Sequence, residues 1–388
     1  MRIKFELVHI ILFIACFFVI SLPFYVWNSS WIRHLSELIC ISIFLKHSLK
    51  HSILSIRHRN ILVLFLLLVL YINIRNFNPI SVILNTLLCS VFFIQNSKVL
   101  QYYESYKTFI SIFLLISLVV YFAVLWLNID LPYNSIKTLN SVKPDDYRAY
   151  PFLAVYDSDY GFVRYRFCGP YDEPGVIGTM VSIILYGERY NLKDYRNLVL
   201  FIAGICSFSM FFFVVTAIYY IVFKRKYFAS FLLFIVVATI LYVGRDIDIV
   251  RSLVFERFEI YSSGGGRTTD IFNSIYSEFI TSPDVLWGAG MEKTSELLAA
   301  TGSSSYKSII YGYGIIGFAL VIFFWLYYSY SSLKGDYRSL LIFCFIFFAV
   351  FYQRPALFEP YYCFLYVAIL AKLSTYGKTF NNNNSCYL

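Results

Sequence analysis

The chain has 388 residues, of which 59% are hydrophobic and only 14% are charged, and its formal net charge is +9. A soluble domain carries about 25% charged residues, so this composition excludes an ordinary soluble globular protein. The positive charges are dispersed between apolar runs, which argues against a nucleic-acid partner and favours basic residues in the cytoplasmic loops of a membrane protein.

Long apolar runs divide the chain into predicted membrane-spanning helices. About 17 to 25 helical residues cross the hydrocarbon core of a bilayer, and every backbone amide must be bonded within the segment, so these runs are predicted to be helices. The predicted spans are residues 5–24, 35–45, 61–74, 79–95, 108–129, 174–186, 198–208, 209–223, 228–243, 308–330, 340–352 and 359–371. The first run lacks a small-residue cleavage site, so it is interpreted as a helix rather than a signal peptide.

The distribution of Lys and Arg orients these helices. The connection 46–59 contains four of them, which places it in the cytoplasm, together with the N-terminus and the connections 96–107 and 187–197. The sequence therefore predicts an all-α polytopic protein, one integral membrane domain over residues 1–388, with both termini cytoplasmic. The Asn-rich tail, 379–388, is predicted to be disordered and cytoplasmic.

Residues 198–223 are one apolar stretch whose interpretation decides the sidedness of the rest of the chain. A single helix of this length would be about 39 Å long. It would leave Lys224, Arg225 and Lys226 outside, against the charge rule. A tight hairpin at 206–209 removes the conflict. Two short helices and about twelve spans in all are therefore favoured, with a single helix as the alternative.

On this layout two long loops, 130–173 and 244–307, lie on the outer side, and function concentrates in such loops. All five histidines lie in the first 58 residues, which argues against His-based catalysis or a His-ligated zinc ion in either loop. No metal or cofactor is expected. Of the eight cysteines only Cys168 lies in a long loop, so no disulfide framework is expected there.

The first outer loop ends in a candidate anion site. Arg164 and Arg166 precede Glu173-Pro174, which resembles a helix start with Pro at the first helical position. A helix N-terminus presents unbonded N–H groups and partial positive charge, which suits a phosphate. The alternative is that both arginines contact lipid headgroups or nearby carboxylates.

The second outer loop contains three glycines before Arg267, then Thr268 or Thr269 as a helix cap. The following helix, near 270–280, is predicted to lay an apolar face formed by Ile271, Ile275 and Phe279 on an apolar surface. The loop closes with glycine-rich turns at 287–290, 302–306 and 311–317. Its serines lack the glycine spacing of a nucleophile elbow.

These features together resemble the bacterial O-antigen polymerase (Wzy-type) family of lipopolysaccharide assembly. The resemblance covers the whole chain in topology, and in sequence it is confined to three loop motifs. The residues that carry it are Arg166, Gly169, Glu173-Pro174-Gly175, Arg164 with ten residues before Gly175, Gly266-Arg267, Gly288-x-Gly290 and Tyr313-Gly314-Ile-Ile-Gly317.

The resemblance implies a GT-C-like fold and an inverting, metal-independent glycosyl transfer at the periplasmic face of the bacterial inner membrane. Donor and acceptor are oligosaccharides linked to undecaprenyl pyrophosphate, the bilayer is the surrounding medium, and a chain-length regulator protein is a candidate partner. The cations Arg166 and Arg267, with Arg164 third, suit the departing pyrophosphate, because Arg binds phosphate bidentately.

A carboxylate is expected to deprotonate the acceptor hydroxyl. Glu173 is the first candidate, followed by Asp172 and Asp270, and helix capping is the alternative role for all three. The remaining substrate-binding candidates are Gly169, Gly175 and Tyr306.

Two rival functions stay open. The related O-antigen ligases carry a His-Asn pair shortly before the closing glycines, whereas this chain has Ser303-Ser304 at that place, which counts against a ligase. A flippase or other transporter of lipid-linked oligosaccharides should place ionisable residues within its spans, around a midplane cavity. The charges here cluster in the outer loops instead.

Overall fold

A computed structural model describes residues 6–20, 23–27, 29–50, 56–74, 79–137, 146–157, 165–224, 251, 269–301, 305–333, 336–354 and 359–384. The predicted span 228–243 and the candidate residues Arg164 and Arg267 lie outside the described residues. The described part is mostly helical, and its apolar helices are compatible with a helical membrane protein.

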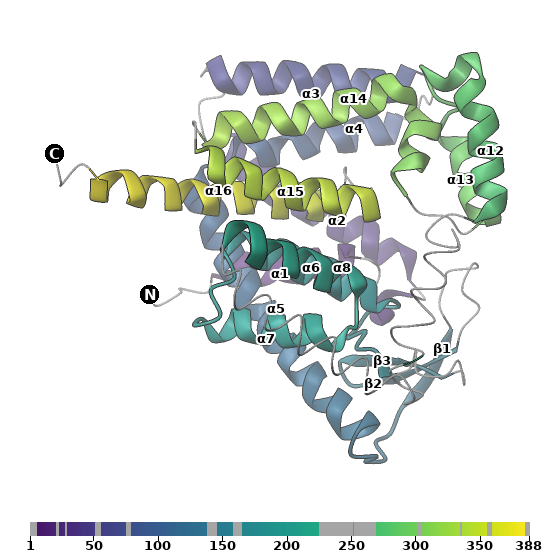
Figure 1. Ribbon diagram of the computed structural model, residues 1–388, viewed down its shortest axis with the longest axis vertical. Helices are drawn as coiled ribbons and strands as arrows, with labels where there is room; N and C mark the ends of the chain where they lie inside the picture. The colour runs from purple at the N-terminus through teal and green to yellow at the C-terminus, as the bar shows by residue number, and fades with distance from the viewer. Residues whose placement is uncertain are drawn as a thin grey trace. The chain divides into compact units, whose positions relative to one another are not determined.

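The chain is drawn with its helices and strands labelled in Figure 1. The elements before the first outer loop are α1 (Leu7–Val19), η1 (Phe24–Val26), α2 (Ser30–Ser48), α3 (Ile56–Ile74), α4 (Pro79–Leu88), η2 (Cys89–Phe93) and α5 (Asn96–Leu125). The first loop contributes the strands β1 (Asn134–Lys137), β2 (Asp146–Tyr150) and β3 (Leu153–Tyr156). The later elements are α6 (Pro174–Gly187), α7 (Tyr195–Cys206), α8 (Met210–Ile218), η4 (Tyr219–Phe223), α12 (Asp270–Thr281), η6 (Pro283–Val285), α13 (Met291–Thr301), α14 (Tyr306–Leu333), α15 (Tyr337–Gln353) and α16 (Pro360–Asn384).

Two described helices, α5 and α14, are long and apolar enough to cross a membrane by themselves. Several shorter apolar helices coincide with predicted spans, among them α1, α6, α7 and α15. The helix α16 continues to Asn384, into the segment that the sequence predicts to be disordered.

The second predicted span looks weak in sequence because it is short and contains Glu37. In the structure α2 is a continuous helix of 19 residues. Arg33 lies one turn before Glu37, with 3.3 Å between its Nε and a carboxylate oxygen, and its Nη2 is 3.1 Å from Glu359. The Glu37 carboxylate is therefore paired with Arg33, so this charged residue does not interrupt α2.

The predicted break in the stretch 198–223 is confirmed. The helix α7 ends at Cys206 and α8 begins at Met210. Between them Phe208 has a φ of 46°, a left-handed conformation that ends a helix. Gly204 lets the two helices approach, because a Cβ there would lie 2.4 Å from the Phe212 ring. The segment is two short helices joined by a tight turn.

The chain divides into two compact units. One consists of residues 1–20, 30–107 and 267–388, and the other of residues 21–29 and 108–266. The second unit contains an antiparallel sheet of order β1-β2-β3, with Ser135 opposite Arg148 and Arg148 opposite Val155. One face of this sheet packs on Trp27, whose ring centroid is 4.9 Å from that of Tyr147.

In the first unit α3 and α14 run side by side, and α12 and α13 lie together beyond one end of α14 (Figure 1). Thr269 caps α12, its hydroxyl accepting a hydrogen bond from the Phe272 amide, as one of the two predicted caps. The predicted apolar face of this helix is correct for Phe279 and wrong for Ile271, and Ile275 is half-buried. The buried stripe is formed by Phe272, Tyr276 and Phe279, whereas Ile271 is 65% exposed.

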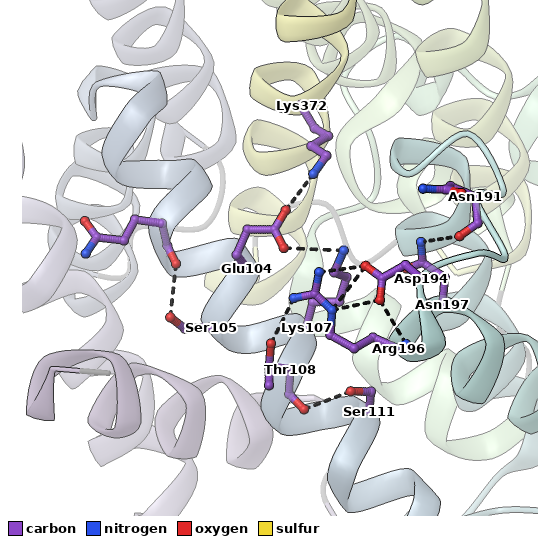
Figure 2. Close-up of polar contacts among 11 residues, drawn as sticks. Glu104, Ser105, Lys107, Thr108, Ser111, Asn191, Asp194, Arg196, Asn197 and Lys372 are labelled. Carbon is purple, nitrogen blue, oxygen red and sulfur yellow. Dashed lines mark hydrogen bonds and ion pairs between the residues drawn. The ribbon is translucent and has the colours of Figure 1, made fainter. Parts of the chain in front are cut away.

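Charged side chains near the predicted cytoplasmic ends are paired with carboxylates. Figure 2 shows Glu104 of α5 between two lysines, 2.5 Å from Nζ of Lys372 and 3.4 Å from Nζ of Lys107. In the other unit Arg196 forms an ion pair of 2.6 Å with Asp194 and donates to the Thr108 hydroxyl over 3.0 Å.

Candidate functional site

The first-loop motif is held from three directions within its unit. The Ala154 amide of β3 donates to the Gly169 carbonyl over 2.7 Å, and the Phe24 amide donates to the Pro170 carbonyl over 2.9 Å. The Phe167 amide donates to the carbonyl of Cys206, at the end of α7. Because the sheet, the 23–27 segment and the hairpin all bond to its backbone, the segment 166–173 is fixed in one conformation where it enters α6.

Arg166 lies over the turn of the α7–α8 hairpin. Its Nε donates to the Ser207 carbonyl over 3.2 Å and its Nη2 to the Phe208 carbonyl over 3.4 Å. These carbonyls follow the C-terminus of α7, where a cation interacts favourably with the helix dipole. Arg166 is half-buried and stands eight residues before the start of α6.

The acidic candidates lie at helix starts, as the sequence predicts, but the side chain that caps α12 is that of Thr269 rather than that of Asp270. Glu173 is the residue before α6, and its carboxylate makes no capping hydrogen bond. Asp172 is half-buried, and its backbone carbonyl accepts hydrogen bonds from the hydroxyls of Tyr147 and Tyr156 over 3.0 and 2.7 Å. The sheet therefore fixes the backbone that carries both carboxylates.

A different structural constraint explains each glycine at the first motif and in the first turns of α6. Gly169 has a φ of +57°, and a Cβ there would lie 3.3 Å from Ile177. Gly175 lies in the first turn of α6, and its carbonyl accepts a hydrogen bond from the Thr179 hydroxyl over 2.9 Å. One turn later Gly178 touches the hairpin, because a Cβ at this position would be 2.4 Å from that of Ser209. The start of α6 is thus packed directly on the turn that Arg166 binds.

Burial also fixes the protonation state of one residue that supports the motif. The pKa of Tyr156 is raised well above its ordinary value, first by burial and then by neighbouring groups that include Cys168 and Tyr147. Its phenol is therefore a neutral hydrogen-bond donor to Asp172 at neutral pH.

In the other unit the closing glycines of the second loop form a backbone clasp, defined here by residues 286–290 and 311–316. The Ala289 and Gly290 amides donate to the Tyr311 and Gly312 carbonyls over 2.7 and 3.1 Å, and the Ile316 amide donates to the Leu286 carbonyl over 3.3 Å. Gly314 has φ 72° and ψ 177°, so the helical path of α14 is broken there. The clasp fastens the loop to this break.

Tyr71, near the end of α3, joins the clasp, and sequence reasoning missed it. Its hydroxyl donates to the Tyr313 carbonyl over 2.8 Å, and its ring stacks on Trp287 with centroids 6.1 Å apart. Trp287 itself remains 49% exposed. Nothing local in the sequence around Tyr71 indicates a partner more than two hundred residues away.

Lys307, in the first turn of α14, is a second residue that sequence reasoning missed. Its ammonium donates to the Asn273 side-chain oxygen over 2.8 Å and lies 5.3 Å from the ring centroid of Tyr276. The neighbouring candidate Tyr306 stacks on Tyr352, with centroids 5.5 Å apart. The available signal was a lysine at the predicted outer end of a membrane helix, where the charge bias does not favour one.

The structure brings together, in one unit, the first-loop candidates Arg166, Gly169, Asp172, Glu173 and Gly175. Asp270, the exposed first residue of α12, and Tyr306 belong to the other unit. Within the described ranges no group of three or more His, Cys, Asp or Glu side chains is arranged to hold a metal ion. Comparison with protein families, curated proteins and solved structures finds no match to this chain.

Proposed function

We propose that this protein polymerises O-antigen repeat units linked to undecaprenyl pyrophosphate, by inverting glycosyl transfer at the periplasmic face of the bacterial inner membrane. The observation that carries the proposal is the first-loop motif. A cationic side chain, a carboxylate and the N-terminus of a short apolar helix are held in one segment by hydrogen bonds from the sheet and the hairpin. Such an arrangement suits a substrate whose leaving group is a pyrophosphate.

The proposed topology has twelve spans, with the first loop, the hairpin turn and the second loop outside. Contacts within each unit support this sidedness, because they join residues that the layout puts on one side of the membrane. Arg166 of the first loop bonds to the 207–208 turn, and Tyr71 bonds to the clasp, on the outer side. Lys372 bonds to Glu104 on the inner side. A single helix over 198–223 would have no turn at 206–209.

Exposed aromatic residues support the same layout, because Trp and Tyr collect at both membrane–water interfaces. Trp31, Trp126 and Trp287 are 64%, 49% and 49% exposed; the first two occupy predicted outer ends, and Trp287 lies in the second outer loop. Tyr195 and Tyr337 are 65% and 69% exposed and occupy predicted inner ends.

In the proposed reaction the acceptor hydroxyl oxygen attacks the anomeric carbon of the donor sugar, and the bond from that carbon to the phosphate oxygen breaks. The hydroxyl proton passes to a carboxylate, with Glu173, the residue before α6, as the first candidate. Arg166 and Arg267 stabilise the departing undecaprenyl pyrophosphate, and no metal ion is required. The product is the polymer, extended by one repeat unit at the acceptor lipid.

The proposal is tested by replacing each arginine with Ala in cells that assemble lipopolysaccharide. A hydrogen bond to a charged group contributes about 1.5 to 3 kcal/mol, and each 1.36 kcal/mol slows a reaction about tenfold. Arg166→Ala and Arg267→Ala should therefore slow polymerisation about tenfold to a hundredfold or more. The expected readout on a gel is lipopolysaccharide bearing one repeat unit instead of a ladder. Lys at either position should restore activity only in part, because it lacks the planar fork.

Arg148→Ala is the matched control. The carboxylate that pairs with this first-loop arginine is that of Asp157, 2.5 Å away and outside the segment 166–173, so its loss should leave the ladder near normal. Protein levels are matched between strains, because Arg166 also fastens the hairpin turn. A normal ladder from both Arg166→Ala and Arg267→Ala would rule out the proposed role.

A further inference from the structure

Two uncharged groups hold the Lys307 ammonium in position. It donates one hydrogen bond to the Asn273 amide oxygen over 2.8 Å, and its Nζ lies 5.3 Å from the ring centroid of Tyr276. Tyr276 is itself buried in the cluster of α12, η6, α13 and α14, so the ring is fixed. A lysine side chain has considerable rotamer freedom, and these two contacts restrict it.

The charge of Lys307 is not neutralised within the described part of the chain. Lys107, Lys372 and Arg196 each lie within 3.4 Å of a carboxylate oxygen. Lys307 has no ion pair with any described carboxylate. Among the described residues, its ammonium has one hydrogen bond, to Asn273, and one ring contact, with Tyr276. An ammonium carries three N–H donors, and Asn273 accepts one hydrogen bond.

The location of Lys307 increases the positive potential further. It is the second residue of α14, and the N-terminus of a helix carries partial positive charge. A cation at this end of a helix is electrostatically unfavourable, whereas an anion there is stabilised. The fixed ammonium and the partial positive charge of the helix N-terminus repel each other. An anion bound between them would relieve this repulsion.

We propose that Lys307 binds a phosphate group of a lipid-linked pyrophosphate substrate at the outer end of α14. The choice of a lipid pyrophosphate rests on the proposed function, while the anion site rests on the contacts of Lys307. The clasp, whose second stretch begins four residues after Lys307, carries exposed apolar side chains that favour an anion with a lipid tail. Leu286, Trp287 and Ile315, all in the clasp, are 49%, 49% and 47% exposed.

The experiment measures binding by the purified full chain in phosphatidylcholine nanodiscs, with farnesyl pyrophosphate and farnesol as probes. The wild type should bind the pyrophosphate more tightly than the alcohol. Lys307→Gln should weaken pyrophosphate binding about tenfold or more, by the loss of one charged hydrogen bond, and should leave farnesol binding unchanged. Lys307→Arg should retain most of the affinity because it keeps the charge.

Lys293→Gln is the matched control, since Lys293 is an exposed lysine on α13 of the same loop, and it should bind like the wild type. Unchanged pyrophosphate affinity in Lys307→Gln would overturn the proposal, as would an equal loss for farnesol, which indicates a packing role. Competition by phosphatidylglycerol that disappears in Lys307→Gln would assign the site to phospholipid headgroups and overturn the choice of a lipid pyrophosphate.

This assay is independent of polymerisation. A normal ladder from both arginine variants, with pyrophosphate binding lost in Lys307→Gln, would reject the proposed function and keep the anion site. Unchanged binding in Lys307→Gln, with the ladder lost in the arginine variants, would reject the anion site and keep the proposed function.

Discussion

Gly288 and Gly314 occupy positions that a larger residue cannot take. Both have positive φ, of 86° and 72°. A Cβ on Gly288 would lie 2.3 Å from the Gly312 carbonyl oxygen, and one on Gly314 would lie 2.2 Å from that of Leu286. The obstructing atoms are backbone and cannot rotate away. The two glycines therefore allow two stretches of chain to approach closely enough to exchange hydrogen bonds.

Replacing Gly288 with Ala should open the clasp. The backbone conformation alone costs a non-glycine residue about 1 to 3 kcal/mol, and the clash adds to this. Hydrogen exchange at the Ala289 and Gly290 amides should accelerate roughly tenfold or more, because both amides are bonded only while the clasp is closed. Leu286→Ala is the control. Leu286 enters the clasp through its backbone carbonyl, which this substitution keeps, and its side chain is half exposed. Unchanged exchange in Gly288→Ala would contradict this account of the clasp.

The small sheet of the first loop acts as a support for the start of α6. Its strands place the Tyr147 and Tyr156 hydroxyls on the Asp172 carbonyl, and its edge residue Ala154 bonds to Gly169. Because the sheet also packs on Trp27, a few short strands fix a segment that would otherwise be an open loop. The stability of this element therefore governs the geometry of the candidate site.

The sheet should lose stability in alkali. Burial raises the pKa of Tyr156 in the folded state, whereas an unfolded tyrosine ionises near pH 10. Above that pH the unfolded state releases a proton that the folded state keeps, so the stabilisation is complete below about pH 10 and falls as the pH rises. The measurement is Trp27 fluorescence against pH, in a variant whose four other tryptophans are Phe.

Tyr156→Phe is the comparison for this titration. It should cost about 1 kcal/mol at neutral pH through the lost hydrogen bond to Asp172, and it should weaken the alkaline transition. An identical alkaline midpoint and slope in the two proteins would mean that Tyr156 does not control the transition.

For the whole molecule the decisive question is on which side of the membrane each connection lies. Reporter fusions at Lys226 and Gly265 should report opposite sides, with Lys226 in the cytoplasm and Gly265 outside. The reason is that, in the proposed layout, the helix break at 206–209 adds one crossing before the basic residues 224–226. A fusion at Lys98 serves as the cytoplasmic reference. If Lys226 reports the outer side, the twelve-span layout is wrong.

The sequence predicts those features that depend on local composition. Apolar runs locate the helices, Glu173-Pro174 marks the start of α6, and the basic residues 224–226 favour the break at 206–209. Features that depend on distant partners could not be predicted. Arg33 stabilises α2 by pairing with Glu359 across the unit, and the buried face of α12 follows from what packs on it, so Phe272 is buried and Ile271 is exposed.

The candidate site also combines features that the sequence predicts with features that depend on distant partners. The motif Arg166 to Gly175 is visible in the sequence because its residues are adjacent. The contact of Arg166 with the hairpin turn is not, since Ser207 lies 41 residues further along the chain. The partners of Lys307 are not visible in the sequence either, since Asn273 lies 34 residues before it.

The contact of Tyr71 with the clasp also sets an order of assembly. Tyr71 is separated from Leu286 by 215 residues and from Tyr313 by 242, and its hydroxyl reaches both carbonyls. A ribosome adds about 5 to 20 residues per second, so α3 is synthesised on the order of ten seconds or more before its partners exist. During that interval the chain holds an incomplete bundle, and the clasp is among the last connections to close. A ribosome stalled shortly before Leu286 would therefore leave a chain whose α3 has no clasp to bind.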